Sequence, residues 1–104
     1  MTRRTHQLRL TINRLVIDTI IIDSHYEEKH NQSVTDETIL EVVRSLDGEE
    51  FEKSSLDEDG FEYYATEPHY VHGKPFRLIW CLPPEKNYLG VINYYRRPYG
   101  KREV

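Results

Sequence analysis

Apolar and polar residues alternate with a period of two over residues 7–23 and again from residue 50 onward, the pattern of half-buried β-strands. Residues 7–23 are rich in β-branched side chains, and Asn13 and Arg14 interrupt the alternation where a hairpin would turn. The segment 15–22 also admits a helix. Its valine, isoleucine and threonine residues favour a strand, because β-branched side chains lose rotamer freedom on a helix. We therefore predict an N-terminal β-hairpin.

The middle of the chain carries the signals of two short helices. Ser24 and the glutamate three positions later fit a capping box, which predicts a short helix over 25–31. A second helix is predicted over 35–46, because Thr35 is a good cap, apolar residues follow at helical spacing and Gly48 comes after them.

The period-two pattern beyond residue 50 predicts strands over 50–54, 61–66, 75–82 and 88–97. The first two are separated by an acidic turn that ends in Asp59-Gly60. The last strand is apolar on both faces over its first half, which suits a central strand. The chain is thus expected to be an α+β domain of short helices packed on an antiparallel sheet. Its predicted core contains Leu40, Val43, Phe76, Leu78, Trp80, Val91 and Ile92.

Composition agrees with one folded domain. With 104 residues, 38% hydrophobic and 12% aromatic, the chain fits a single domain over 1–104, with its core over about 7–97 and a tail over 98–104. No apolar run approaches the roughly 18 residues of a membrane span, and the first residues lack the pattern of a signal peptide. The single cysteine, Cys81, excludes an internal disulfide. We expect a soluble, cytoplasmic protein without a membrane partner.

Charge is distributed unevenly along the chain. The formal net charge is −4, but residues 47–67 carry one basic and nine acidic side chains, whereas residues 68–104 carry seven basic and two acidic ones. A surface that binds anions is therefore compatible with the negative total.

Histidines on the predicted short helix are candidates for acid–base chemistry. His25 and His30 are five residues apart and do not share a helix face, so a metal site is not expected, and no cofactor motif is present. A histidine titrates near neutral pH and suits proton transfer. Two ordinary surface histidines on a capped helix are the alternative.

The C-terminal run from Asn93 to Arg102 interleaves cations with aromatic rings, the composition of an RNA-binding strand. A solvated chain end is the alternative. Alternation places Tyr94 with Arg96 on one face and Tyr95 with Arg97 on the other, so only one pair can line a site. Arg77 lies between apolar neighbours inside a predicted strand and needs either a carboxylate of the acidic loop or an anionic ligand. Cys81 is expected to be a buried, unreactive thiol.

Residues 24–30, 34–39, 75–80 and 91–97 resemble small BrnT-like and RelE-like ribonuclease toxins of bacterial type II toxin–antitoxin systems. Lys29-His30 matches the Lys-His of the BrnT-like pattern, and His25 follows a serine as in related sequences. Arg77 and either Arg96 or Arg97 are looser matches to the strand arginines. The N-terminal hairpin and the acidic loop depart from the pattern. The resemblance implies short helices before a twisted antiparallel sheet, with RNA bound on the sheet.

The resemblance also implies a metal-independent endoribonuclease, an mRNA-interferase-like toxin that cleaves single-stranded RNA and pairs with a cognate antitoxin protein. His25 or His30 would act as base or acid beside Lys29. Arg77 and Arg96 would hold the phosphate, and Tyr95 would stack on or protonate a nucleotide. The competing interpretation is a non-enzymatic binding module, of inhibitor or immunity type, that docks on a basic partner through its acidic loop.

Overall fold

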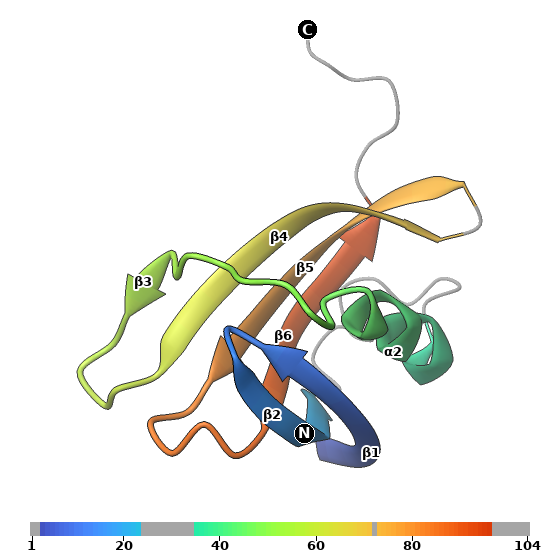
Figure 1. The fold of residues 1–104 in the computed structure, drawn as a ribbon. Helices are drawn as coiled ribbons and strands as arrows, with labels where there is room; N and C mark the ends of the chain where they lie inside the picture. Colours follow the sequence, from blue (N-terminus) through green and yellow to red (C-terminus); the bar gives the residue numbers. More distant parts are fainter. Residues whose placement is uncertain (1–2, 24–34, 72, 97–104) are drawn as a thin grey trace, which may run out of the picture.

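The computed structural model describes residues 3–23, 35–71 and 73–96, so the predicted short helix over 25–31 lies outside the described residues. In chain order the elements are β1 (Arg3–Ile12), β2 (Leu15–Asp23), α2 (Asp36–Arg44), β3 (Ser55–Leu56), β4 (Glu62–Val71), β5 (Lys74–Leu82) and β6 (Leu89–Arg96). The strands form one six-stranded sheet in the order β1-β2-β6-β5-β4-β3. Figure 1 shows the sheet strongly twisted, with the β1–β2 hairpin at a steep angle to β4. The predicted α+β class is confirmed.

The N-terminal hairpin is confirmed with the predicted turn. Asn13 and Arg14 both have positive φ angles, 52° and 67°, as the two central residues of a type I′ turn require. β1 begins at Arg3, four residues before the start that the alternation predicts, and its pairing with β2 is irregular between Gln7 and Leu10. The longer strand brings the basic N-terminal residues into the sheet.

One strand pairing differs from the predicted antiparallel sheet. β2 and β6 run parallel, with Ile20 opposite Leu89 and Ile22 opposite Val91. A short turn forces neighbouring strands to run antiparallel, but most of the chain separates β2 from β6, so no turn fixes their relative direction. β6 lies between β2 and β5 and is a central strand, as predicted.

Helix α2 begins at its predicted cap. The Thr35 hydroxyl accepts a hydrogen bond from the Thr38 amide at 3.2 Å, which satisfies one of the free amides of the first turn. The helix ends at Arg44, before the predicted end at residue 46, because Ser45 and its neighbours form turns that lead to Gly48 at φ +83°. α2 is too short and too polar to cross a membrane, and the described residues contain no helix that could.

The core lies between α2 and one face of the sheet. The Trp80 ring stacks on Tyr64 at 4.1 Å between ring centroids and meets Phe51 edge-on at 5.4 Å. Most of the predicted core is buried there, and Leu40 is partly buried against it. Ile92 is the exception: a β-bulge places it between the paired positions, and its side chain is half-buried on the opposite face.

The predicted strand over 50–54 is wrong, because only residues 55 and 56 of this region form a strand. The Phe51 amide donates a hydrogen bond to the Asn13 side-chain oxygen at 2.6 Å instead of joining a ladder. Its ring still packs on Trp80. The apolar residue predicted here is thus a core contact without being part of the sheet.

No described helix covers the opposite face of the sheet, which we call the open face. Strand register runs across it from Ile21 to Gly90, Cys81 and Tyr63. Ile21 and Tyr63 are half-buried, so the face is apolar without being sealed. Farther along β5, alternation adds Ile79 to this face.

Candidate functional site

Arg77 lies on the open face near the start of β5. Its side chain is half-buried, and its Nε atom is shielded from solvent without a hydrogen-bond partner. No carboxylate in the described part of the chain pairs with it. Asp57 and Asp59 lie instead in a pocket beside Cys81, four residues or about 13 Å along the strand. The sequence allows two partners for Arg77, a carboxylate of the acidic loop or an anionic ligand. The described residues do not supply the carboxylate.

An exposed tyrosine shares this end of the open face. Tyr70 of β4 is 68% exposed and pairs with Pro75, two residues before Arg77 on β5. Pro75 and Arg77 have the same strand parity, so Tyr70 and Arg77 belong to one face. Diagonal neighbours in a sheet lie about 7–8 Å apart, within reach of long side chains. An aromatic ring beside a guanidinium suits a base and its phosphate.

The strand register relates the predicted C-terminal site residues to Arg77. Tyr95 is the backbone partner of Arg77, whereas Arg96 is the partner of Phe76, which is buried on the covered face. Tyr95 therefore has the parity of the open face, and Arg96 has the parity of Tyr94, which is fully buried. The other predicted site residues, His25, Lys29 and His30, lie outside the described residues.

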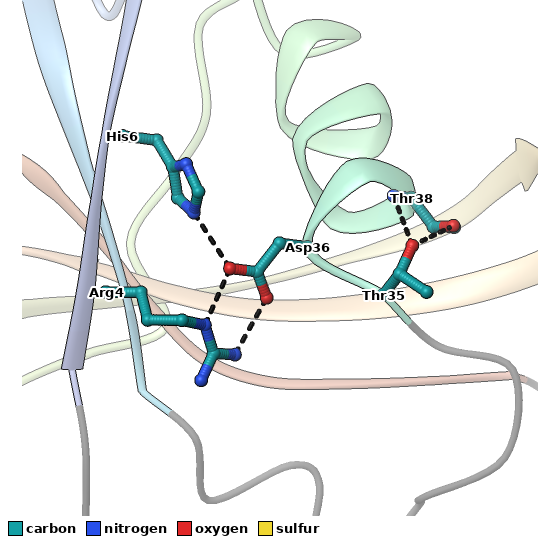
Figure 2. Close-up of polar contacts among 5 residues, drawn as sticks. All are labelled: Arg4, His6, Thr35, Asp36 and Thr38. Carbon is teal, nitrogen blue, oxygen red and sulfur yellow. Dashed lines mark hydrogen bonds and ion pairs between the residues drawn. The ribbon is translucent and has the colours of Figure 1, made fainter.

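A second polar cluster joins β1 to the start of α2 (Figure 2). Arg4 donates two hydrogen bonds to the Asp36 carboxylate, from Nε at 2.6 Å and from Nη2 at 2.7 Å. His6 donates from Nε2 to the same carboxylate at 2.8 Å. A bidentate guanidinium and an imidazole thus hold one carboxylate at the first residue of the helix, where the amide dipoles also favour negative charge.

This cluster fixes the ring of His6, since Nε2 is held by Asp36. Sequence reasoning placed Asp36 in a helical first turn but missed its partners. The sequence does hold one signal: Arg4 and His6 alternate along β1 with the same parity as Leu8, which predicts that all three share one face of the strand. Nothing in that pattern indicates which element would face them.

His69 belongs to a hydrogen-bonded chain between β4 and the end of α2. Trp80 donates from its indole to the Thr66 hydroxyl at 3.2 Å, and that hydroxyl lies 2.7 Å from His69 Nε2. His69 Nδ1 lies 3.2 Å from the Ser45 hydroxyl, which donates to the Val42 carbonyl at 2.5 Å. Burial lowers the pKa of His69. The neutral imidazole, protonated at Nδ1, satisfies every partner, so this histidine is structural.

Four segments meet in a wide pocket of about 760 Å³ at the hairpin turn. Asn13 donates to the Tyr64 hydroxyl at 3.1 Å, and that hydroxyl donates to Glu62 at 2.9 Å. Lys86 lies 3.4 Å from the other Glu62 oxygen. Burial, with Glu62 as the second cause, raises the pKa of Tyr64 to about 12. The phenol is thus a neutral donor that ties the turn to β4.

No three histidine, cysteine, aspartate or glutamate side chains gather in metal-binding geometry among residues 3–23, 35–71 and 73–96. No protein-family model, characterised protein or solved structure matches the chain. Function must therefore follow from the chemistry of the chain's own residues, and the open face near Arg77 carries a cationic donor that is shielded from solvent and has no partner among the described residues.

Proposed function

We propose that this protein binds single-stranded RNA at the Arg77 end of the open face and acts as a metal-independent endoribonuclease of the BrnT-like and RelE-like kind. The observation that carries the proposal is the half-buried Arg77 guanidinium, which has a shielded Nε and no described carboxylate partner. Leaving a buried donor unpaired is costly, and a phosphate oxygen is the acceptor that a guanidinium prefers.

The surroundings of Arg77 suit a single strand. The exposed ring of Tyr70 offers a stacking surface for a base. The chain leaves this end of the sheet through β6 into the basic run that contains Arg96 and Arg97. A run of cations in the sequence supplies the positive charge that binding of an RNA backbone requires.

The proposed reaction uses the RNA's own 2′-hydroxyl as nucleophile. A base, His25 or His30, takes the hydroxyl proton while the oxygen attacks phosphorus, and Arg77 stabilises the charged phosphorane. The bond from phosphorus to the 5′-oxygen breaks, and the second histidine returns a proton to that oxygen. The products are a 2′,3′-cyclic phosphate and a 5′-hydroxyl. Lys29 adds positive charge beside the histidines, and Tyr95, the backbone partner of Arg77, contacts a nucleotide.

The binding step is tested with a fluorescent single-stranded RNA. Arg77→Ala should weaken RNA binding by at least about fivefold. It should also reduce the slope of log affinity against log salt concentration by roughly one, the value expected for the loss of one phosphate contact. Arg14→Ala is the matched control, because its side chain is 84% exposed at the hairpin turn and the charge change is identical. Equal losses in the two variants, or salt-insensitive binding, would contradict a phosphate site at Arg77.

The cleavage step is tested with the same RNA under conditions that retain binding. His25→Ala or His30→Ala should lower the cleavage rate by at least about 100-fold with little change in affinity. Cleavage should persist in EDTA and leave a 2′,3′-cyclic phosphate. Wild-type rates in both variants would refute the assignment of the histidines. An RNA that binds but is never cut would leave an RNA-binding protein without the enzymatic activity.

The toxin interpretation has a separate test. Induction of the wild-type chain in a bacterial host should arrest growth, and the cleavage-deficient histidine variants should not. A cognate antitoxin is the protein partner that this interpretation requires, and both would act in the cytoplasm. Normal growth under wild-type induction, with cleavage intact in vitro, would separate the ribonuclease from the toxin role.

A further inference from the structure

A pocket of about 400 Å³ lies on the open face at the opposite end from Arg77. Its lining includes the apolar side chains of Ile21, Cys81 and Ile92 and the aromatic residues Tyr63 and Tyr88. A pocket of this size accommodates one small group or one side chain. It is separate from the Arg77 site and from the wide pocket at the hairpin turn.

Gly90 keeps space open in this pocket. A Cβ atom at this position would lie 3.0 Å from the Cys81 sulfur and 3.5 Å from a ring carbon of Tyr88. Any larger residue would therefore place its side chain between the thiol and the ring. The pocket depends on the absence of a side chain near the start of β6.

Negative charge is fixed at the rim by Asp57. Its carboxylate accepts hydrogen bonds from the amides of Asp59 and Phe61, at 2.9 and 3.0 Å, and from the Tyr63 hydroxyl at 2.8 Å. The Phe61 amide is the main reason that the pKa of Asp57 is lowered. The carboxylate therefore stays ionised and cannot turn away from the pocket.

Two further carboxylates share the rim. Asp23 lies 4.0 Å from Arg3, whereas the exposed Asp59 carboxylate has no hydrogen bond or ion pair among the described residues. Among the described residues that line the pocket, three are aspartates and one is an arginine. This charge opposes RNA phosphates and favours a cation.

We propose that this pocket binds an arginine or lysine side chain presented by a partner protein. Such a side chain combines an apolar stem, which matches the apolar lining, with a cationic head, which matches Asp57 and Asp59 at the rim. Tyr63 and Tyr88 also line the pocket, and aromatic rings attract a cation through their π-electrons. A protein partner fits better than a free amine, because the half-buried Ile79 extends the apolar surface beyond the pocket.

The probe is a capped peptide with one arginine between two leucines, and its control replaces the arginine with neutral, nearly isosteric citrulline. Calorimetric titration should show binding of the arginine peptide and at least about fivefold weaker binding of the citrulline peptide. Equal affinities for the two peptides, or no binding of the arginine peptide at millimolar concentration, would overturn the proposal.

Two variants test the location. Asp59→Asn should weaken the arginine peptide about threefold to fivefold, whereas Glu58→Gln, an exposed neighbour that does not line the pocket, should leave affinity unchanged. Gly90→Ala should weaken binding at least about tenfold by filling the pocket, with folding verified by thermal unfolding. If Gly90→Ala does not fold, the Asp59 and Glu58 comparison decides alone, and equal effects of those two variants would place the peptide elsewhere.

The same variants separate this pocket from the RNA site. Single-stranded RNA should bind Asp59→Asn at least as tightly as wild type, because a rim carboxylate repels phosphate, and Arg77→Ala should leave peptide affinity unchanged. Loss of RNA binding in Asp59→Asn with unchanged peptide binding would assign the pocket to RNA and overturn the proposal.

Discussion

The two faces of the sheet come from one alternating pattern but have different chemistry. The covered face is sealed by α2 and centred on the stacked rings of Trp80 and Tyr64. The open face carries half-buried Ile21 and Ile79, with Arg77, whose Nε has no partner among the described residues, at one end and a group of carboxylates at the other. Apolar residues on the covered face stabilise the fold, whereas those on the open face remain partly accessible. Both binding sites that we propose lie on the open face, so our proposals place stability and binding on opposite sides of the same strands.

The sharpest contrast between the faces is the adjacent pair Trp80 and Ile79. Trp80→Ala should lower the free energy of unfolding by about 3–5 kcal/mol, because the fully buried indole leaves a cavity and loses its ring contacts. Ile79→Ala should cost about 1 kcal/mol, because that side chain is only half-buried. Urea unfolding measures both. Similar losses would mean that the open face is as tightly packed as the covered one.

Cys81 tests how far the open face admits solvent. Burial raises the pKa of its thiol to about 11, so very little thiolate is present at pH 8. Labelling by a maleimide should therefore be at least about 100-fold slower in the native protein than in urea, where an ordinary thiol has a pKa of about 8.5. Native labelling within a few-fold of the urea rate would show that the pocket opens to solvent at Cys81.

Stability on the covered side should depend on pH through His69. Because burial lowers the pKa of His69 below 6.5, the unfolded chain binds its proton first as the pH falls. The contribution is complete above about pH 6.5 and is lost below it, by about 1 kcal/mol if one hydrogen bond to Thr66 is broken. The measurement is the difference in unfolding free energy between wild type and His69→Gln from pH 7.5 to 5.5. A difference independent of pH would contradict a neutral histidine.

The smallest expected effect is at the hairpin turn, where both faces end. Arg14→Gly should stabilise the protein by about 0.5 kcal/mol, because Arg14 is held at φ +67° and its exposed ion pair with Glu50 contributes little. Asn13→Gly has the opposite expected sign, because it removes the hydrogen bonds to Phe51 and Tyr64. Chemical denaturation of the two variants and the wild type measures the two changes in unfolding free energy, which should have opposite signs.

The fold was largely predictable where a local signal determines it. The Asn13-Arg14 turn, the Thr35 cap and the buried face of β5 follow from turn chemistry, capping and period two. The parallel pairing of β2 with β6 could not be predicted, because no local residue encodes the relative direction of strands that lie far apart in the chain. The strand over 50–54 was mispredicted because the apolar Phe51 reaches the core from an irregular segment.

The candidate site was predictable only one residue at a time. Arg77 was recognisable as a charge inside an apolar strand, and alternation gave its face. The pocket of about 400 Å³ on the open face was missed. Two of its carboxylates, Asp23 and Asp59, are distant in sequence and come together only through the pairing of four strands. The contact of Arg4 and His6 with Asp36 was also missed, because these residues are about 30 positions apart in the sequence.

The parallel pairing of β2 with β6 also determines when the sheet can be completed during folding. Ile20 to Ile22 must find Leu89 to Val91, so the central pairing closes a loop that contains most of the chain. During synthesis the N-terminal hairpin emerges early, and the edge of β2 stays unpaired until β6 has been made. Folding should therefore be slow for a protein of this length, and the isoleucine-rich β2 is the segment most exposed to misassembly in that interval.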